Sequence, residues 1–420
     1  AAFPATKLPE NLRTSLGNQG LELPKNGLEL GQALQIAIWT TTPWTLPANL
    51  AVSVNEKLDY SFAVDNQGRL LLVAAELLPS LRDTLALELT ARATVKGALL
   101  AGLIYKHPLL DRDSPIVIGG EYITTESGTG LVHTAPGHGV DDFNTGQKHD
   151  LGMLCPVDES GTMTSEAGPF AGLNVLKDAN PTIIAALEER GALLKHEPYA
   201  HRYPYDWRTK KPTIFRATEQ WFASVEGFRN EALTAINSVE WLPASGRNRM
   251  EAMVRERGDW CISRQRTWGV PIPVFYEREG NEVLLNDETL AHVKALITEH
   301  GADVWWERNE DELLPPAYAA EAERWRKGTD TMDVWFDSGS SWAAVASQQD
   351  GLAYPAELYL EGSDQHRGWF QSSLLTSVAI NSQAPYRQVL THGFALDEKG
   401  RKMSKSLGNV VDPAVIIDGG

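Results

Sequence analysis

Residues 402–406 read Lys402-Met403-Ser404-Lys405-Ser406, and Leu407-Gly408-Asn409 follows them. Two lysines flank small hydroxyl residues in this glycine-bounded loop. The pattern predicts a mobile cationic clamp, because ammonium groups stabilise the charge that builds up on a departing pyrophosphate. Lysine-rich loops are more often only solvated, so charge alone favours that simpler interpretation, and the wider sequence has to be considered.

From about residue 197 onward, apolar strand-like runs alternate with helical patterns. This alternation predicts an α/β layer arrangement. Residues 277–328 are charged and predict an insertion into it. One helix of the insertion is delimited by cap residues at Asn286 and Gly301, with an apolar face that includes Val293.

Residues 1–195 show a different pattern, in which short β-like runs are separated by turn residues. The runs cover residues 34–39, 51–54, 60–64, 70–74, 91–95 and 116–118. They predict a compact β-rich unit. Its clearest helix is expected near the end, between cap signals at Asp178 to Pro181 and a terminating Gly191.

Composition limits the class of protein. The chain has 420 residues, 42% of them hydrophobic, which is enough for two or three domains. No run approaches the roughly 20 apolar residues that span a bilayer, and the N-terminus lacks a signal-peptide core, so we expect a cytoplasmic protein without a membrane partner. Cys155 and Cys261 lie far apart, which predicts neither a disulfide nor a zinc site. The missing initiator Met and the apolar run that begins at Val410 predict truncation at both ends.

A formal charge of −17 argues against general nucleic-acid binding, because phosphate backbones are bound mainly by clustered Lys and Arg. The charge is unevenly distributed, however. Residues 201–216 carry five basic side chains and one acidic one, and residues 247–266 contain six arginines. The interleaved aromatic residues are Tyr203, Tyr205, Trp207, Trp260 and Trp268. Solvated surface is the usual explanation of such runs, but the aromatic residues leave a basic lane for nucleic acid open.

The string at 402–406 matches the signature loop of class I aminoacyl-tRNA synthetases, and further strings resemble the same family in one consistent order. The strings in the β-rich part are Trp39-Thr40-Thr41-Thr42-Pro43-Trp44-Thr45-Leu46-Pro47-Ala48-Asn49, Gly128-Thr129-Gly130, His133-Thr134-Ala135-Pro136-Gly137-His138-Gly139 and Asp141-Asp142-Phe143. Those in the α/β part are Asp259-Trp260-Cys261-Ile262-Ser263-Arg264-Gln265, Asp333-Val334-Trp335-Phe336-Asp337-Ser338-Gly339 and Glu361-Gly362-Ser363-Asp364-Gln365-His366-Arg367-Gly368-Trp369-Phe370. The resemblance extends from Trp39 to Pro413.

Within this family, the chain resembles the enzymes specific for isoleucine. The valine and leucine enzymes share the layout, but their editing threonine motif typically reads Thr-Thr-Arg-Pro. This chain has Thr41-Thr42-Pro43-Trp44 preceded by Thr40, with no arginine. A paralogue similar to the valine enzymes stays open as an alternative.

The resemblance implies both fold and function. The expected fold class is α/β, with a β-rich editing domain at 1–195 followed by the C-terminal half of a Rossmann-like catalytic domain at 196–420. The implied reaction is ATP-dependent activation of isoleucine and its transfer to tRNA(Ile), with hydrolysis of the mischarged valyl-tRNA ester. ATP with Mg²⁺ is then a substrate, no zinc is expected in this part of the enzyme, and a monomer is expected.

Editing is expected because one methylene separates valine from isoleucine, and the established discrimination by a hydrophobic pocket is only ~1–3 kcal/mol. The implied editing pocket consists of Thr40, Thr41, Thr42, Asn49, His133 and Asp142. Thr42 and its neighbours would place hydroxyls around the ester, and Asn49 would shape the pocket. Asp142 would bind the substrate ammonium group, and His133 would orient water or the ribose hydroxyl.

Each of these residues also has a purely structural explanation. The threonines before Pro43 could end a strand, and Asp142 could cap a helix. His133 with His138 could suggest a metal site, but no third ligand beyond the neighbouring aspartates is evident, and we expect no metal. The ordered set of motifs is what favours the functional interpretation.

The implied aminoacyl-adenylate and ATP site consists of Trp335, Glu361, Gly362, Asp364, Gln365, Trp369, His392, Lys402 and Lys405. Its acids and amides would hold ribose hydroxyls and an ammonium group, and Gly362 would let the backbone approach closely. Trp335 and Trp369 would form walls for the isoleucine side chain, and His392 would approach the nucleotide. Tryptophans at such spacing, and a single histidine, are more often core residues.

A His-Ile-Gly-His-type tetrad, the other signature of the family, does not occur in this sequence. We therefore expect residues 1–420 alone to be competent at most for editing. A freestanding editing hydrolase is a second hypothesis, which the lysine loop disfavours because such an enzyme releases no pyrophosphate. A tRNA-binding module without catalysis is a third.

Overall fold

The computed structural model describes residues 1–206, 209–280 and 282–419, and the chain divides into two compact units, Ala1–Thr218 and Glu219–Gly420. This division lies beyond the predicted domain boundary at 195/196. Hydrogen bonds hold the intervening segment to the first unit: Ala217 N donates to Gly137 O over 2.7 Å, and His138 Nδ1 donates to Phe215 O over 2.9 Å. Residues shortly before Thr218 are therefore part of the first unit.

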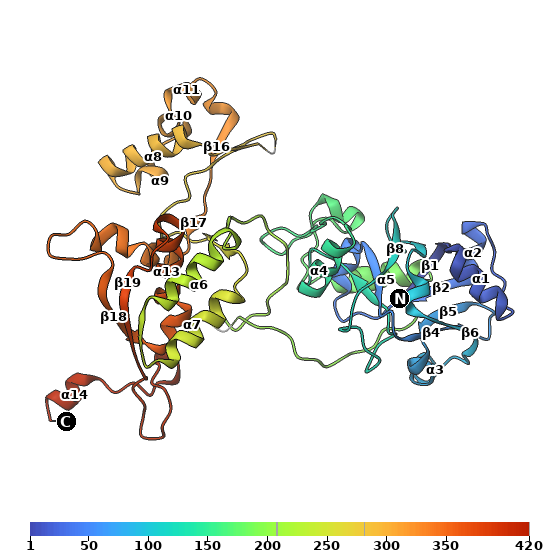
Figure 1. The fold of residues 1–420 in the computed structure, drawn as a ribbon. Coiled ribbons are helices and arrows are strands. Elements are labelled where there is room, and N and C mark those ends of the chain that lie inside the picture. Colours follow the sequence, from blue (N-terminus) through green and yellow to red (C-terminus); the bar gives the residue numbers. More distant parts are fainter. Residues whose placement is uncertain (207–208, 281, 420) are drawn as a thin grey trace. The chain divides into compact units, whose positions relative to one another are not determined.

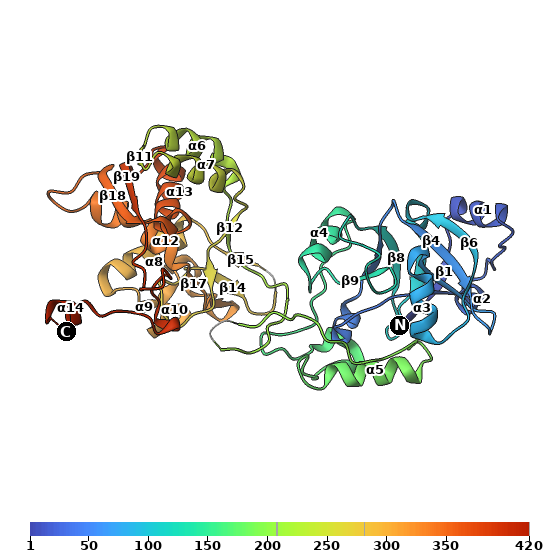
Figure 2. The same ribbon diagram turned by 90° about the horizontal axis from the view of Figure 1, so that it is seen from below.

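The first unit is built around one mixed sheet with the strand order β6-β4-β5-β2-β1-β7-β8-β3-β9 among the described residues (Figures 1 and 2). Its strands are β1 Ala2–Lys7, β2 Leu34–Ala37, β3 Ala51–Val54, β4 Asp59–Val64, β5 Leu70–Ala74, β6 Thr90–Lys96, β7 Ile104–Lys106, β8 Asp113–Ile118 and β9 Val132–Thr134. Every residue of β5 is buried, which explains its uninterrupted apolar sequence.

Helices and 3₁₀ turns surround this sheet and close its core. They include α1 Glu10–Asn18, α2 Gly27–Ala33, η1 Pro43–Ala48, α3 Leu78–Leu85, α4 Val140–Lys148 and α5 Ala179–Glu189. Phe3, Tyr60, Phe62 and Tyr105 are fully buried at the centre. The core is shared by residues from β1 to α5, so the unit folds as one body.

The second unit contains a parallel sheet with the order β11-β19-β18, built from β11 Glu240–Leu242, β18 Ala356–Gly362 and β19 Tyr386–His392. Helices α6 Arg229–Asn237, α7 Ser245–Arg255, α12 Val334–Gly339 and α13 Trp369–Asn381 pack with it (Figure 2). The shared core includes Trp241, Phe370, Leu374 and Val389. The predicted fold class, a β-rich part followed by an α/β part, is confirmed.

Shorter elements complete the second unit. They are β10 Phe222–Ala223, β12 Trp260–Cys261, β13 Ser263–Arg264, β17 Thr331–Met332, η7 Trp342–Ala346, η8 Ser363–Arg367, η9 Lys405–Leu407 and α14 Pro413–Ile417. β10 pairs with β12, and β13 pairs with β17, both antiparallel. The second pair joins the segment just after β12 to the residues just before α12.

Residues 275–327 have a core of their own, which includes Phe275, Trp305, Leu313 and Trp325. The elements are β14 Phe275–Glu277, β15 Val283–Leu284, α8 Asp287–His300, α9 Val304–Glu307, α10 Glu310–Leu313, α11 Pro316–Ala319 and β16 Trp325–Lys327. The predicted helix is present as α8. Asn286 caps it and forms a reciprocal capping box with Thr289, and Gly301 ends it with φ +83°.

Among the residues that the structure describes, no helix is long and apolar enough to cross a membrane. Helix α14 has only five residues, too few to span a bilayer. The side chains of its residues Ile416 and Ile417 are largely exposed.

Candidate functional site

The threonine motif lies in the turn between β2 and η1. Thr42 N donates to Thr40 Oγ1 over 3.0 Å, so the first threonine fixes the backbone of the third. Trp44 N donates to Asn180 Oδ1 over 2.9 Å, which ties η1 to helix α5. The turn is therefore held from inside and from a neighbouring helix.

A cavity of about 530 Å³ opens beside this turn within the first unit. Thr40 and Thr41 line it, together with Trp39 and Pro43. The lining also includes apolar side chains of α3 and α5, and polar groups such as Thr84 and Glu126. Its volume suits a ligand of the size of an aminoacyl nucleoside, and its lining offers both hydroxyls and apolar groups.

His133 lies on β9, behind the turn, and is 7% exposed. Its Nε2 is 2.8 Å from Thr45 Oγ1, and its Nδ1 is 2.9 Å from Asn49 Nδ2. Burial lowers the pKa of the imidazole to about 3, with smaller contributions from His107 and His138. His133 is therefore a neutral ring with both nitrogens engaged, and this differs from the predicted contact with water or the ribose.

Asp142 lies in the first turn of α4, and its Oδ2 accepts a hydrogen bond of 2.8 Å from Ala135 N. Burial raises the pKa of this carboxyl group to about 6, the Ala135 N–H opposes the rise, and the neighbouring Asp141 adds to it. A carboxylate desolvated in this way is stabilised by an approaching cation. The alternative that Asp142 caps the helix differs from the structure, because the N-cap is Gly139 and the Asp142 carboxylate accepts from Ala135 N, which precedes the helix.

Thr45 and Ala135 connect the three central residues of the predicted editing pocket, which are Thr42, His133 and Asp142. Thr45 Oγ1 donates to Thr42 O over 2.9 Å and reaches His133 with the same oxygen. Ala135, two residues after His133, binds Asp142. Of the predicted pocket residues, Thr40 and Thr41 line the cavity, and Thr42, Asn49, His133 and Asp142 are not among its lining residues. Asn49 and His133 are buried.

Two contacts of the first unit near the predicted site residues were not expected from the sequence. Trp44 packs its ring edge-on against His138, with centroids 4.9 Å apart. Tyr105 donates from its hydroxyl to Asn49 Oδ1 over 2.6 Å. Tyr105 carries no motif, so only a structure could associate it with the site.

In the second unit, several predicted adenylate residues gather at the carboxyl ends of two parallel strands. Glu361 pairs with Thr391, and Gly362 pairs with His392, where β18 and β19 end. The carboxyl edge of a parallel sheet is where α/β folds bind ligands. A Cβ atom on Gly362 would lie 2.8 Å from Asp364 Oδ1, so a larger residue would require the exposed Asp364 carboxylate to shift.

The two predicted tryptophan walls differ in environment. Trp335 is 41% exposed and lies over Gly368, where a Cβ atom would approach its ring to 2.8 Å. Trp369 stacks on Tyr359 with centroids 3.9 Å apart and donates its indole N–H to Ser338 O. Trp335 is thus available to a ligand, and Trp369 is largely a packing residue. Gln365 Oε1 accepts from Trp369 N over 3.0 Å.

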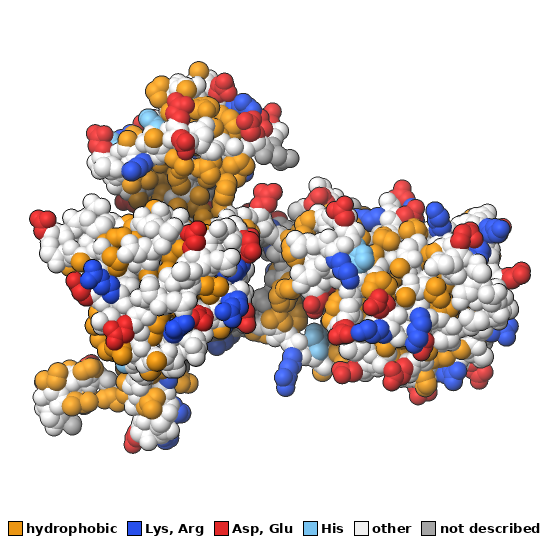
Figure 3. All heavy atoms as spheres, viewed as in Figure 1, with side chains coloured by type: hydrophobic (Ala, Val, Ile, Leu, Met, Phe, Trp, Pro, Cys, Tyr) orange, Lys and Arg blue, Asp and Glu red, His pale blue; other side chains and the backbone are white. Residues whose placement is uncertain are grey.

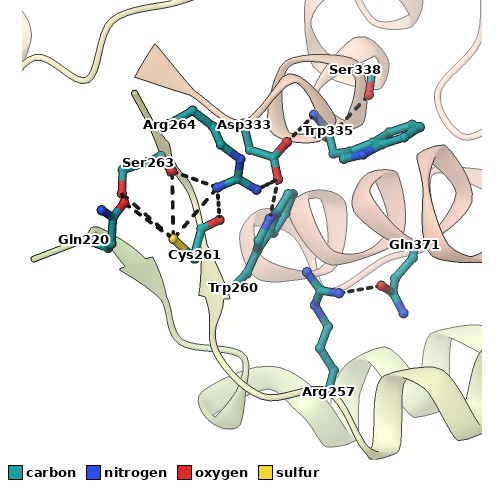
Figure 4. Close-up of polar contacts among 10 residues, drawn as sticks. All are labelled: Gln220, Arg257, Trp260, Cys261, Ser263, Arg264, Asp333, Trp335, Ser338 and Gln371. Atoms are coloured by element: carbon teal, nitrogen blue, oxygen red, sulfur yellow. Dashed lines mark hydrogen bonds and ion pairs between the residues drawn. The ribbon is translucent and has the colours of Figure 1, made fainter. Parts of the chain in front are cut away.

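Asp333 holds Trp335 in place (Figure 4). Its carboxylate, 6% exposed, accepts from Arg264 Nη2 over 2.6 Å, from Trp260 Nε1 over 3.0 Å and from Trp335 N over 3.1 Å. The last bond is the N-cap of α12. The Arg264–Asp333 ion pair joins the motif that begins at Asp259 to the motif that begins at Asp333. Sequence reasoning missed this contact.

The lysine loop is ordered by polar side chains at its two sides. Asn409 accepts from Ser404 N over 2.9 Å and donates to Asp397 Oδ2 over 2.9 Å. Lys402 Nζ lies 3.6 Å from the centroid of the Phe394 ring, and Lys405 is exposed. Phe394 also lies near Gly362, so Lys402 is connected to the carboxyl edge of the sheet.

Several side chains of the two basic runs, 201–216 and 247–266, are bound to other groups of the protein. In the second run, Arg264 binds Asp333, Arg247 pairs with Glu251, and Arg257 donates to Gln371 Oε1 over 2.7 Å. Figure 3 shows Lys and Arg side chains interspersed with acidic ones on the face that it draws. Trp207 and Arg208 of the first run lie outside the described residues. In the part that is described, no group of three or more His, Cys, Asp or Glu side chains could hold a metal ion.

Comparisons with known proteins agree with the motifs. Over 419 residues the chain is 99% identical to the isoleucine–tRNA ligase of Prochlorococcus marinus (strain MIT 9313) and 77% identical to that of Parasynechococcus marenigrum (strain WH8102). Each match covers 100% of this chain and 43% of the relative, so the chain spans less than half the length of these relatives. A crystal structure of GlLeuRS-CP1 overlaps 47% of this chain and 99% of its own, with 15% identity and a TM-score of 0.37. A family model for "tRNA synthetases class I (I, L, M and V)" matches residues 11–419, and the chain belongs to this family.

Proposed function

We propose that this chain is the part of an isoleucine–tRNA ligase that carries the editing domain and the second half of the adenylate-forming domain. The observation that carries the proposal is the 99% identity to an isoleucine–tRNA ligase across the whole chain. Under this proposal, the first unit hydrolyses valine wrongly attached to tRNA(Ile). The second unit contributes to activating isoleucine with ATP and Mg²⁺.

The cavity beside the threonine turn is the proposed place of the valyl ester. Thr40 and Thr41 supply hydroxyl groups that donate to or accept from the ester and the ribose. Apolar residues of α3 and α5 limit the size of the side chain that can enter. A cavity that admits valine and rejects isoleucine by size achieves what the first selection cannot, since one methylene is worth only ~1–3 kcal/mol.

Asp142 is the proposed partner of the substrate ammonium group. Burial raises the pKa of this carboxyl group to about 6, so its surroundings disfavour the charged form. Binding a cation nearby reverses that effect, because an opposite charge stabilises the ionised form. The ammonium group of an aminoacyl ester is such a cation, whereas a free nucleotide offers none.

His133 and Asn49 act as positioning residues under this proposal. Both are buried, and both nitrogens of the imidazole are engaged within the protein. Their contribution is to hold Thr45, and through it the threonine turn. A neutral buried imidazole fits this role better than that of a titrating acid or base.

For the second unit, Glu361, Asp364, Gln365 and His392 are proposed to hold the adenylate at the carboxyl edge of the parallel sheet. Trp335 covers the isoleucine side chain. Lys402 and Lys405 stabilise the departing pyrophosphate, for which two exposed cations on one loop are suited. Such a protein acts on tRNA in the cytoplasm, and we propose that it acts as a monomer.

Hydrolysis of Val-tRNA(Ile) by the 420-residue chain tests the proposal. We expect loss of the ester to be faster than in buffer, and Asp142→Ala to abolish the acceleration. Asp141→Ala is the matched control, because Asp141 is exposed on the same helical turn. If Asp142→Ala hydrolyses the ester as fast as the unchanged chain, the site is not catalytic in the proposed way.

The same preparation distinguishes the remaining alternatives. A tRNA-binding module without catalysis would bind Val-tRNA(Ile) and leave its ester intact. A ligase similar to the valine enzymes would spare the valyl ester. We expect no isoleucine-dependent pyrophosphate exchange by residues 1–420, since the family's His-Ile-Gly-His-type tetrad does not occur in them; detectable exchange would contradict this expectation.

A further inference from the structure

Four side chains and one carbonyl form a continuous hydrogen-bonded relay through the core of the first unit. The relay runs from Tyr105 to Asn49, then to His133, to Thr45 and to the carbonyl of Thr42. Its distances are 2.6, 2.9, 2.8 and 2.9 Å in that order. Tyr105 and Asn49 are 0% exposed, so water does not replace these contacts.

The carbonyl oxygens at the relay determine the direction of every hydrogen bond. Asn49 Nδ2 is 2.8 Å from Ala51 O, which can only accept, so this side of the amide is the NH₂ group. The other side is then the oxygen, and it accepts from the Tyr105 hydroxyl. The second NH₂ proton points to His133 Nδ1, which must accept it.

The imidazole therefore carries its single proton on Nε2. That proton is donated to Thr45 Oγ1, which leaves the hydroxyl proton of Thr45 free to be donated to Thr42 O. The direction of the last hydrogen bond in the relay thus depends on the orientation of the Asn49 amide. Burial, which lowers the pKa of His133, keeps the ring in this neutral form.

We propose that Tyr105 and Thr45 are positioning residues for the threonine turn: the Tyr105 hydroxyl and the Ala51 carbonyl together fix the Asn49 amide, the amide fixes the tautomer of His133, and the tautomer directs Thr45 onto the Thr42 carbonyl. The proposal rests on the proposed hydrolytic function, because the turn so held presents Thr40 and Thr41 to the cavity. Neither residue is among those that line the cavity, so both act through others.

Losing the Tyr105 hydroxyl has two possible consequences, and both loosen the turn. If Asn49 keeps its orientation, its buried oxygen has lost its donor, which is costly in a dry site. If the amide rotates, His133 Nδ1 must carry the proton, Nε2 becomes an acceptor, and Thr45 turns its proton away from Thr42. Hydrolysis then slows because the hydroxyls at the ester are displaced.

Nitrogen-15 NMR of histidine-labelled chain tests the relay without any substrate. We expect His133 to show an unprotonated Nδ1 and a protonated Nε2, with no titration between about pH 8 and about pH 5. Tyr105→Phe is expected to populate the other tautomer or broaden these signals. Tyr60→Phe is the matched control, since Tyr60 is equally buried and donates to Gly130 O outside the relay; His133 signals should not change in it.

Kinetics on Val-tRNA(Ile) provide the functional measurement. Tyr105→Phe and Thr45→Val are expected to lower kcat roughly tenfold with KM nearly unchanged, and Thr45→Ser, which keeps the hydroxyl, should restore most of the rate. A protonated Nδ1 in the unchanged chain, or Tyr105→Phe with the tautomer and kcat of the unchanged chain, would overturn the proposal. Should the chain not hydrolyse Val-tRNA(Ile) while the tautomer is as expected, the proposed function fails and the relay geometry stands.

Discussion

His133 Nε2 lies 2.8 Å from Thr45 Oγ1 in the buried centre of the first unit. The ring cannot take up a second proton there without losing its acceptor contact with Asn49 Nδ2. A neutral imidazole is therefore part of the folded structure of the first unit, with consequences for its stability at low pH.

Acidification should destabilise the first unit. The pKa of His133 is about 3 when folded, against 6.5 as its ordinary value, so the unfolded chain binds the proton first and the free energy of unfolding falls as the pH drops below about 6.5. At pH 4 the loss amounts to roughly 3 kcal/mol as an upper limit. Hydrogen exchange of the amides of β3 and β9, followed from pH 7 to pH 4, measures it, and His133→Gln should show a shallower dependence. An unchanged pH dependence in His133→Gln would contradict the prediction.

Hydrolysis of the valyl ester should follow the ionisation of Asp142. The pKa of about 6 predicts that kcat/KM falls as the pH drops through about 6, because the protonated carboxyl group cannot bind the ammonium group. Asp141→Asn removes a repulsive charge and should move the midpoint to lower pH. A midpoint that does not move in Asp141→Asn would show that another group controls the rate.

Gly130 cannot be replaced by alanine without cost. Its φ is +73°, and a Cβ atom would lie 2.3 Å from Ala74 Cβ. Gly130→Ala should lower the free energy of unfolding by about 3 kcal/mol, from backbone strain together with overpacking. Gly68→Ala is the control, since φ is +82° and nothing lies within 4 Å of the added atom; about 1 kcal/mol is expected there. Urea unfolding monitored by circular dichroism compares the two variants. An equal decrease in the free energy of unfolding would show that the contact with Ala74 adds nothing to the cost of Gly130→Ala.

Asp333 should stabilise the second unit. Asp333→Asn places an amide where Arg264 and Trp260 donate, and we expect a loss on the order of 2 kcal/mol, reduced from that of a fully buried pair because Arg264 is 37% exposed. Glu226→Gln is the control, because the carboxylate that pairs with Arg229 is 81% exposed; less than about 0.5 kcal/mol is expected. Exchange of the α12 amides reports the local effect. If Asp333→Asn and Glu226→Gln lower the free energy of unfolding by the same small amount, the Arg264–Asp333 pair is not the stabilising contact.

Local sequence signals predicted the elements that have strong local causes. The runs at 51–54 and 70–74 are β3 and β5 with the predicted bounds, and the cap residues around Asn286 and Gly301 delimit α8. Apolar alternation and capping act within a few residues, so they can be read from sequence. Helices α1 and α2 were not predicted, although Asn26 caps α2 through Leu28 N.

The parts of the site that sequence reasoning missed are contacts between distant residues. Tyr105 and Asn49 are 56 positions apart, and Arg264 and Asp333 are 69 apart. Motif resemblance identified the individual side chains Asn49 and His133 but not that they are buried. Burial and pairing depend on how strands β7, β3 and β9 are ordered in the sheet, which no local pattern determines.

The selectivity of ester hydrolysis tests the central claim most directly. The 420-residue chain is mixed with Val-tRNA(Ile) and, separately, with Ile-tRNA(Ile), and the ester remaining is followed over time. The proposed editing cavity predicts rapid loss of the valyl ester and an isoleucyl ester that decays only as in buffer. Equal hydrolysis of both esters, or of neither, would contradict it.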